Sequence, residues 1–320
     1  MIPTLTSILG RLRFKQLSVL VALEECGSIH RAAERLNMTQ PGLTKALHEI
    51  ESTFGTQLFV RSKAGVLANE LGQCVIRYAR IQETELGHLR DEMNGVLRGS
   101  GGRVAVGAIT GALHGVLIET ISRLRVQQPL LSIEVRESAS LDLLEWVNEG
   151  RLDLAVCRTT VVGSTEQFDY QPLMEEAVAA AVGLKHPLVK ARRVSLSQVA
   201  KYPWVVYPGN MPLRKFLEQE FRQEGLELPS YPTETASSLA TMLMLKQDQN
   251  LVALMASATM DFCEEHHIAH RLPLQFSTRN EGFGIVTRRG ARLSPAANLM
   301  IACMRSIVEE SYQAYSDREA

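Results

Sequence analysis

Four hydrogen-bonding side chains, Gln40, Thr44, Lys45 and His48, lie close together near the amino end of the chain. Their spacing places all four on one broad face of a helix. A glutamine can pair with adenine, a lysine with guanine, and a threonine with a base edge, a thymine methyl group or a phosphate. This combination indicates nucleic-acid recognition, although an ordinary solvent-exposed helix can carry the same residue types.

An apolar stripe and a cap predict the helix that must position these side chains. Leu43, Leu47 and Ile50 recur at spacings of four and three residues, so they are expected to face inward. Thr39 is a suitable N-cap, and Pro41 falls in the first turn, where a missing N–H costs nothing. The polar side chains are therefore left on the outer face.

A second, shorter helix is expected just before this one. Ser28 is a suitable N-cap, and Ala32, Ala33 and Leu36 form one apolar stripe. Asn37 begins a tight turn, because asparagine tolerates the left-handed backbone that lets the next helix leave at an angle. Two short helices joined in this way predict a helix-turn-helix.

This stretch resembles the LysR-type transcriptional regulators, which open with a winged helix-turn-helix. Thr39–Pro41 and Thr44–Lys45 stand where the family has its Ser/Thr-Gln-Pro and Ser-Arg patterns. Residues 14–22 resemble the family's first helix, and Leu58–Phe59 followed by Arg61 resembles the entry to the wing. The resemblance implies a regulator that binds double-stranded promoter DNA and contacts RNA polymerase.

A short hairpin is expected after the helix-turn-helix, with a turn at residues 62–65. Arg61 and Lys63 at its tip can reach a phosphate or the minor groove, although a solvated turn is the alternative, above all for Lys63. The helix-turn-helix and this hairpin together supply the expected DNA contacts. These are Ser28, Arg31, Thr39, Gln40, Pro41, Thr44, Lys45, His48, Arg61 and Lys63.

Length and composition indicate a globular protein of two or three domains. The chain has 320 residues, 45% of them hydrophobic and 22% charged. Its net charge is −1, but the segment from Arg11 to Gly65 holds eight Lys or Arg and five Glu, a local charge of +3 that suits phosphate binding. With no membrane-length apolar run, no signal peptide and five scattered cysteines, a cytoplasmic protein is expected.

A long helix is expected between the DNA-binding part and the rest of the chain. Its apolar residues form a heptad-like stripe, and so long a helix is unlikely to be stable alone. Pairing with a copy of itself, as in the family's linker helix, is favoured over packing on its own domain, and the family resemblance implies a homotetramer. The stripe comprises Leu71, Val75, Tyr78, Ile81, Leu86, Leu89, Met93 and Val96.

Alternating strands and helices follow, which predicts parallel α/β sheets. They resemble a two-lobed type 2 periplasmic-binding fold, in which the chain crosses between lobes twice. The expected fold class is thus α/β with an N-terminal all-α winged helix-turn-helix. The expected divisions are a loose tail to residue 10, the DNA-binding domain at 11–68, a dimerising linker helix at 69–98, a hinge at 99–102, lobe I at 103–178 and 268–310, and lobe II at 179–267.

Four segments that each follow a strand or precede a helix are expected to line one cleft between the lobes. They contain Thr110, Gly111, Ala112, Arg158, Thr159, Gly209, Asn210 and Ser237. Arg158 is a candidate for a fixed charge opposite an anionic effector, or alternatively forms a salt bridge on the rim. Ser237 is a ligand contact or only a helix cap. No cofactor is expected, and the effector is expected to be a small organic acid, an aromatic compound or a sugar derivative.

Two other readings of the chain are weaker. Cys157 at a strand end, or Cys263 with His266 and His270, would suit a redox- or metal-responsive regulator. A buried thiol and an ordinary helix end are the commoner cases. The sequence contains no catalytic or nucleotide-binding signature, so a cytoplasmic α/β enzyme or a solute-binding protein is not favoured.

Overall fold

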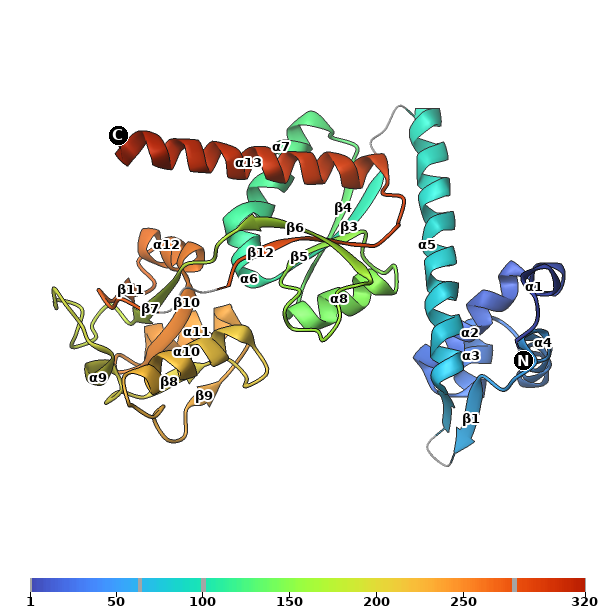
Figure 1. The fold of residues 1–320 in the computed structure, drawn as a ribbon, viewed down its shortest axis with the longest axis horizontal. Helices are drawn as coiled ribbons and strands as arrows, with labels where there is room; N and C mark the ends of the chain where they lie inside the picture. Colours follow the sequence, from blue (N-terminus) through green and yellow to red (C-terminus); the bar gives the residue numbers. More distant parts are fainter. Residues whose placement is uncertain (1, 63–64, 99–101, 278–280, 320) are drawn as a thin grey trace. The chain divides into compact units, whose positions relative to one another are not determined.

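The computed structural model describes residues 2–62, 65–98, 102–277 and 281–319 (Figure 1). Only the backbone is described for residues 61–62, 91–92, 95–96, 98, 312 and 314–319. The chain forms two compact units, one of residues 1–102 with 146–152 and one of residues 103–145 with 153–320. Each unit is described by itself.

The first unit is helical except for one hairpin. Its elements are α1 (Leu5–Arg11), α2 (Phe14–Cys26), α3 (Ile29–Arg35), α4 (Gln40–Phe54), β1 (Phe59–Ser62), β2 (Gly65–Ala68) and α5 (Glu70–Arg98). Its core is built from fully buried aliphatic side chains of α2, α3 and α4, including Leu20, Leu23, Ala32, Leu43 and Ile50. Ala32, Leu43 and Ile50 are among the inward-facing positions that the apolar spacing predicted.

Three residues with positive φ set the angles between the helices of the first unit. Gly27 ends α2 at φ 59°, Gly55 ends α4 at φ 68°, and Asn37 turns the chain between α3 and α4 at φ 52°. The strand β2 is held against the first of these turns, because the Val66 N–H donates to the Gly27 carbonyl at 3.0 Å. The hairpin is therefore fixed to the helix-turn-helix.

The expectation of a loose tail at residues 1–10 was wrong. Residues 5–11 form α1, which Thr4 caps by accepting from the Ser7 N–H at 3.4 Å. A helix of seven residues gains too little from its own hydrogen bonds to be stable. Packing against α4 supplies the missing stabilisation, and sequence periodicity does not register such a contact.

The long helix expected at the end of the DNA-binding part is α5. Ile76 and Ala79 are buried, and Arg80 forms ion pairs with Glu24 and Glu25 of α2 at 2.6 and 2.7 Å. Ile81 of the heptad-like stripe is buried, Val75 is half-buried, and the side chain of Val96 lies outside the described residues. The exposed members of the stripe are Leu71, Tyr78, Leu86, Leu89 and Met93.

The second unit contains two five-stranded sheets. The first sheet has the order β4-β3-β5-β12-β6, formed by β3 (Arg103–Ala108), β4 (Ser132–Glu137), β5 (Leu154–Cys157), β6 (Phe168–Met174) and β12 (Phe283–Arg288). β3 pairs in parallel with β4 and β5, and β12 pairs antiparallel with β5 and β6. The helices of this part are α6 (Thr110–Ala112), the π-helix η1 (Leu113–Leu117), α7 (Ile118–Gln127), α8 (Ser140–Asn148) and α13 (Pro295–Glu319).

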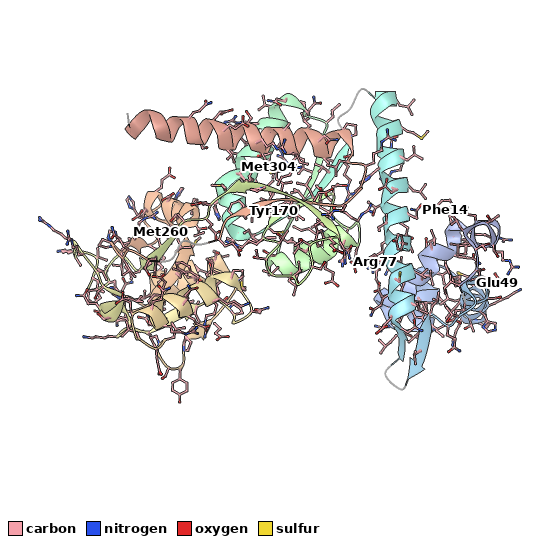
Figure 2. All side chains as sticks on the ribbon, viewed as in Figure 1. Phe14, Glu49, Arg77, Tyr170, Met260 and Met304 are labelled. Carbon is pink, nitrogen blue, oxygen red and sulfur yellow. The ribbon has the colours of Figure 1, made fainter. Side chains whose placement is uncertain are left out.

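The closing helix α13 packs on α7 and on the first sheet, with Met300 and Met304 fully buried (Figure 2). The helical segment that follows β3 begins at Thr110 and passes through the π-helical turn η1 before α7. Thr110 and Gly111 are therefore helical residues and not part of a preceding loop.

The second sheet has the order β11-β7-β10-β8-β9. It is formed by β7 (Val178–Val182), β8 (Trp204–Val206), β9 (Thr233–Glu234), β10 (Val252–Ala256) and β11 (His270–Arg271), with helices α9 (Leu196–Val199), α10 (Pro212–Gln223), α11 (Ser238–Gln247) and α12 (Ser257–Glu265). Its core includes Trp204 packed edge-to-face on Phe221. Each sheet thus has a core of its own.

The chain passes between the two sheets twice. The first passage lies between β6 and β7, at residues 175–177. The second comes after β11, a few residues later than the expected position near Ile268, because His270 and Arg271 still pair antiparallel with β7. The strand β11 itself is only two residues long.

Candidate nucleic-acid interface and interlobe cleft

The helix α4 presents the polar face that its sequence predicted. Thr39 Oγ1 accepts from the Gly42 N–H at 3.2 Å, so the helix has a side-chain cap, and Pro41 occupies its first turn. Burial of the apolar stripe fixes the rotation of the helix. Gln40, Lys45 and His48 are exposed as a result, and Thr44 is half-buried beside them.

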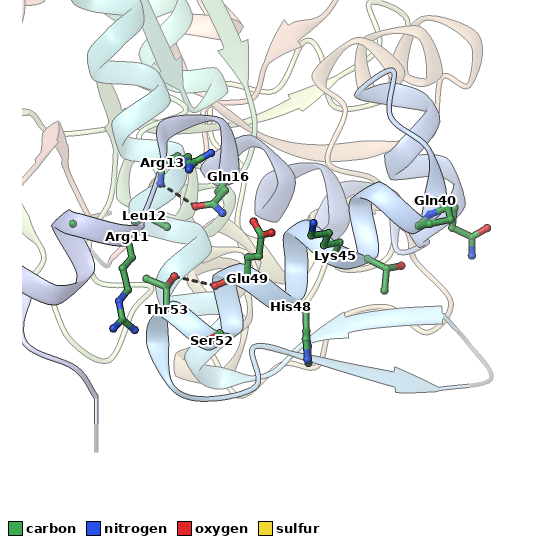
Figure 3. Close-up of a pocket in the computed structure, with 13 residues that line it drawn as sticks. Arg11, Leu12, Arg13, Gln16, Gln40, Lys45, His48, Glu49, Ser52 and Thr53 are labelled. Atoms are coloured by element: carbon green, nitrogen blue, oxygen red, sulfur yellow. Dashed lines mark hydrogen bonds between the residues drawn. The ribbon is translucent and has the colours of Figure 1, made fainter.

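The outer face of α4 lines a groove of about 1400 Å³ (Figure 3). Residues 10–13 and Gln16, from the junction of α1 and α2, line the same groove. Two hydrogen bonds brace it: the Arg13 N–H donates to Gln16 Oε1 at 2.9 Å, and Thr53 Oγ1 donates to the Glu49 carbonyl at 2.9 Å. The α4 residues lining it are Gln40, Pro41, Thr44, Lys45, His48, Glu49, Ser52 and Thr53.

Ser28 and Arg31 occupy the start of α3. Ser28 is the N-cap residue, and its carbonyl accepts from the Ala32 N–H at 2.9 Å, but its side chain makes no capping hydrogen bond. The expected side-chain cap is therefore a backbone cap, and the hydroxyl does not serve the helix. Arg31 is exposed and donates to the Cys26 carbonyl at the end of α2.

The hairpin expected as a wing is present as β1 and β2, an antiparallel pair in which Arg61 is aligned with Val66. The side chain of Arg61 and the whole of Lys63 lie outside the described residues. The hydrogen bond from β2 to the α2–α3 turn shows that the hairpin starts from a fixed base beside α3.

A cleft of about 930 Å³ lies between the two sheets of the second unit. Five of the eight expected effector contacts line it: Thr110, Gly111, Arg158, Asn210 and Ser237. The other three are not among the lining residues. Ala112 and Thr159 are buried, and Gly209 is exposed.

The floor of the cleft holds a buried ion pair. The guanidinium of Arg158 and the carboxylate of Glu176 are in contact, and each side chain is only 5% exposed. Arg158 Nε also donates to the Glu281 carbonyl at 3.1 Å. A Cβ added at Gly111 would lie 1.8 Å from Glu176 Oε1, so the carboxylate sits directly against that glycine.

The salt bridge that the sequence offered as an alternative for Arg158 is present, but it is buried and does not lie on the rim. The charge faces neither a rim carboxylate nor open solvent, because Glu176 already neutralises it at depth. Glu176 lies 18 residues away, in the passage between β6 and β7, and no local pattern marks it. A buried arginine does require a partner, and that rule was the one signal available.

Carboxylates and hydroxyls line the rest of the cleft. Thr110 Oγ1 donates to Glu137 Oε1 at 2.6 Å, and Ser138 Oγ donates to Asp142 Oδ2 at 2.6 Å. Ser237 Oγ accepts from the Ala240 N–H at 3.2 Å, so it caps α11 as the alternative for this residue proposed. The charged lining residues are Glu137, Asp142, Glu176, Arg158 and Lys215.

The phenol of Tyr207 also lines the cleft and stays protonated. Burial, reinforced by the negative charge of Glu176, raises the pKa of Tyr207 to about 12. At neutral pH this side chain can therefore donate a hydrogen bond and carries no charge. Tyr207 and the carboxylates therefore supply the cleft with both a hydrogen-bond donor and hydrogen-bond acceptors.

Cys157 and Cys263, the two thiols that the sequence singled out, are buried and poorly placed for redox chemistry. Burial raises the pKa of Cys157 to about 12 and that of Cys263 to about 11, so neither is a thiolate at neutral pH. Of the suggested metal ligands, Cys263 is fully buried and His266 Nδ1 lies 3.0 Å from the Phe262 carbonyl. Within the described ranges no three His, Cys, Asp or Glu side chains are grouped to hold a metal.

Comparison with known proteins gives matches over nearly the whole chain. The model of the bacterial regulatory helix-turn-helix protein, lysR family, matches residues 14–73, and that of the LysR substrate binding domain matches residues 97–308. The transcriptional regulator GbpR of Azospirillum brasilense is 30% identical over 93% of this chain and 87% of its own length. The uncharacterized regulator YdcI of Escherichia coli K12 is 28% identical over 92% of this chain and 95% of its own length.

Solved structures share the fold at lower identity. The LysR family regulator CbnR aligns with a TM-score of 0.68 and 15% identity, covering 93% of this chain and 99% of that one. CbnR in complex with its target DNA aligns with a TM-score of 0.66 and 16% identity, covering 92% of this chain and all of that one.

Across the described part of the chain, no helix combines the length and apolar character needed to cross a membrane.

Proposed function

The chain belongs to the LysR family of bacterial transcriptional regulators, and from this premise we propose how it recognises DNA and what controls it. Its relatives are transcriptional regulators and not enzymes, so the enzyme alternative is set aside. The observation that carries the DNA proposal is the capped helix α4, whose buried stripe leaves Gln40, Thr44, Lys45 and His48 facing outward. We assign these four side chains to base edges in the major groove.

The other contacts expected from the sequence serve the DNA backbone in this proposal. Phosphate contacts fix the register of a protein on the duplex and carry no sequence information. Thr39 and Pro41 bring the amino end of α4 to the groove, and Ser28 and Arg31 lie at the start of α3. Arg61 and Lys63 of the hairpin reach the neighbouring phosphates or the minor groove.

Substitution separates base reading from backbone binding. Gln40→Ala is expected to relax sequence preference, since it removes a base contact, and Arg61→Ala to weaken binding to all duplexes alike. Fluorescence anisotropy with the cognate duplex and a scrambled one measures both. An unchanged preference in Gln40→Ala would remove α4 from its proposed role.

We propose that the protein acts as a homodimer through α5, and that dimers join into a tetramer. The exposed apolar side chains of α5, Leu86, Leu89 and Met93 among them, are the surface for this pairing. Paired helices would hold two copies of α4 at a fixed separation on a two-fold DNA site. Leu89→Glu combined with Met93→Glu should shift the mass in light scattering toward the monomer. Regulation through contact with RNA polymerase, in the cytoplasm, is part of the same proposal.

We further propose that the controlling molecule is small, uncharged and rich in hydroxyl groups. Arg158 is neutralised by Glu176, so an anion gains little from it, and the carboxylates of Glu137 and Asp142 outnumber the one remaining lysine of the lining, Lys215. Carboxylate oxygens accept hydrogen bonds from ligand hydroxyls, and Tyr207 donates one. A sugar-like or phenolic compound fits this lining better than an organic acid, and the cleft needs no cofactor.

Thermal-shift measurements with matched probes test the effector class. Glucose against gluconate, and catechol against benzoate, each compare a neutral compound with an anionic one. A ligand that binds the native state raises the melting temperature. The neutral members should do so at millimolar concentration, and stabilisation by gluconate or benzoate alone would contradict the proposal.

A further inference from the structure

The amino-terminal helix α1 and its junction with α2 form a basic wall beside the recognition helix. Arg11 is the last residue of α1, and Arg13 precedes α2. Both side chains are exposed and line the groove whose other wall is the outer face of α4 (Figure 3). The match to the helix-turn-helix family model begins at Phe14, so Arg11 and Arg13 lie outside the matched residues.

The junction is held in place and is not a free tail. The Leu12 N–H donates to the Ile8 carbonyl at 2.8 Å and closes α1. One residue later the Arg13 N–H donates to Gln16 Oε1 at 2.9 Å and opens α2. These two hydrogen bonds fix the backbone of the junction between α1 and α2. The side chains of Arg11 and Arg13 therefore extend from defined backbone positions.

The charges in the groove are unbalanced. Arg11, Arg13 and Lys45 form no ion pair with any side chain that the structure describes, and Glu49 is the one carboxylate among the groove's lining residues. Two other arginines of the same unit are neutralised: Arg80 pairs with Glu24 and Glu25, and Arg35 also pairs with Glu25. Cations left without a partner beside a DNA-reading helix suit a polyanion.

We propose that Arg11 and Arg13 bind backbone phosphates on the rim of the major groove that α4 enters. The major groove of DNA is about 12 Å wide, which is close to the diameter of a helix with its side chains. The flanks of α4 would therefore lie next to the DNA phosphates. An arginine on an adjoining wall can meet a phosphate with two parallel hydrogen bonds. This inference rests on the proposed function, because it needs α4 in the major groove.

Salt titration of the full-length protein tests the proposal. A plot of log K against log salt concentration has a negative slope, and each phosphate contact makes that slope steeper by about 0.9. Arg11→Ala with Arg13→Ala should therefore flatten the slope by about 1.8 for each bound protomer, or about 3.6 for a dimer, and weaken binding at 0.1 M salt by roughly 10- to 100-fold per protomer. Cognate and scrambled duplexes should be affected alike, and Arg11→Lys with Arg13→Lys should retain most of the affinity.

A matched control separates this effect from a general change of charge. Arg192→Ala with Arg193→Ala removes the same charge from two exposed positions of the second unit and should leave the slope unchanged. A slope in the Arg11 and Arg13 variant equal to that of the control overturns the inference. If Gln40→Ala relaxes sequence preference in the same assay, the proposed function stands even then. If Gln40→Ala has no effect on preference, the proposed function fails first.

Discussion

Glu176→Gln removes one partner of the buried ion pair beneath the cleft, and its effect on stability can be estimated from the structure. Both side chains are 5% exposed, so solvent does not screen the interaction. Taking one partner from a buried pair costs about 3–5 kcal/mol, because the other charge is left uncompensated. For a folded unit of this size each kcal/mol corresponds to about 2–4 °C, so the melting temperature should fall by roughly 6–20 °C.

Urea unfolding and thermal melting of the full-length chain measure this loss. The control is the double variant Arg158→Met with Glu176→Leu, since replacing a buried pair by apolar side chains is often neutral. It should be more stable than either Arg158→Met or Glu176→Leu alone, which a double-mutant cycle of these three variants expresses as a coupling energy. Acetate should also bind Glu176→Gln more tightly than the parent protein, because Arg158 is then free to accept an anion.

Two results would refute the reasoning. A loss below about 1 kcal/mol would be that of a surface pair and would mean that water reaches these charges. A double variant as unstable as the sum of its two single variants would mean that Arg158 and Glu176 do not depend on each other. Either result would remove the main support for the proposal that the effector is uncharged.

Three further predictions follow from local geometry. Thr39→Ala should lower the free energy of unfolding by about 1 kcal/mol, since it removes the cap of α4, and urea titration measures it. Cys157, with its pKa raised to about 12, should resist iodoacetamide at pH 8 until the protein unfolds, as mass spectrometry would show. Burial raises the pKa of Glu25, but hydrogen bonds from Arg80 and Arg35 outweigh it and hold that pKa below 4.5. Its stabilising effect is therefore full above pH 4.5 and lost as the pH falls through the lowered value, so melting curves of the parent protein and Glu25→Gln should converge in acid.

The sequence alone predicted the fold class and the elements whose signals are local. Apolar spacing, a capping threonine and a turn asparagine specified α3 and α4, because each acts within one or two turns of helix. The sequence also predicted the length of α5 and the stripe of apolar side chains along it. These signals need no partner elsewhere in the chain, so they can be recognised before the structure is known.

Only the tertiary structure decided the features that depend on distant partners. Nothing local links Arg158 to Glu176, which the fold brings together across 18 residues, so the buried ion pair beneath the cleft could not be read from the sequence. Residues 5–11 lack the length to be helical alone, and become helix because they pack on α4. Sequence patterns record what a segment does by itself, whereas burial and ion pairing depend on which segments meet.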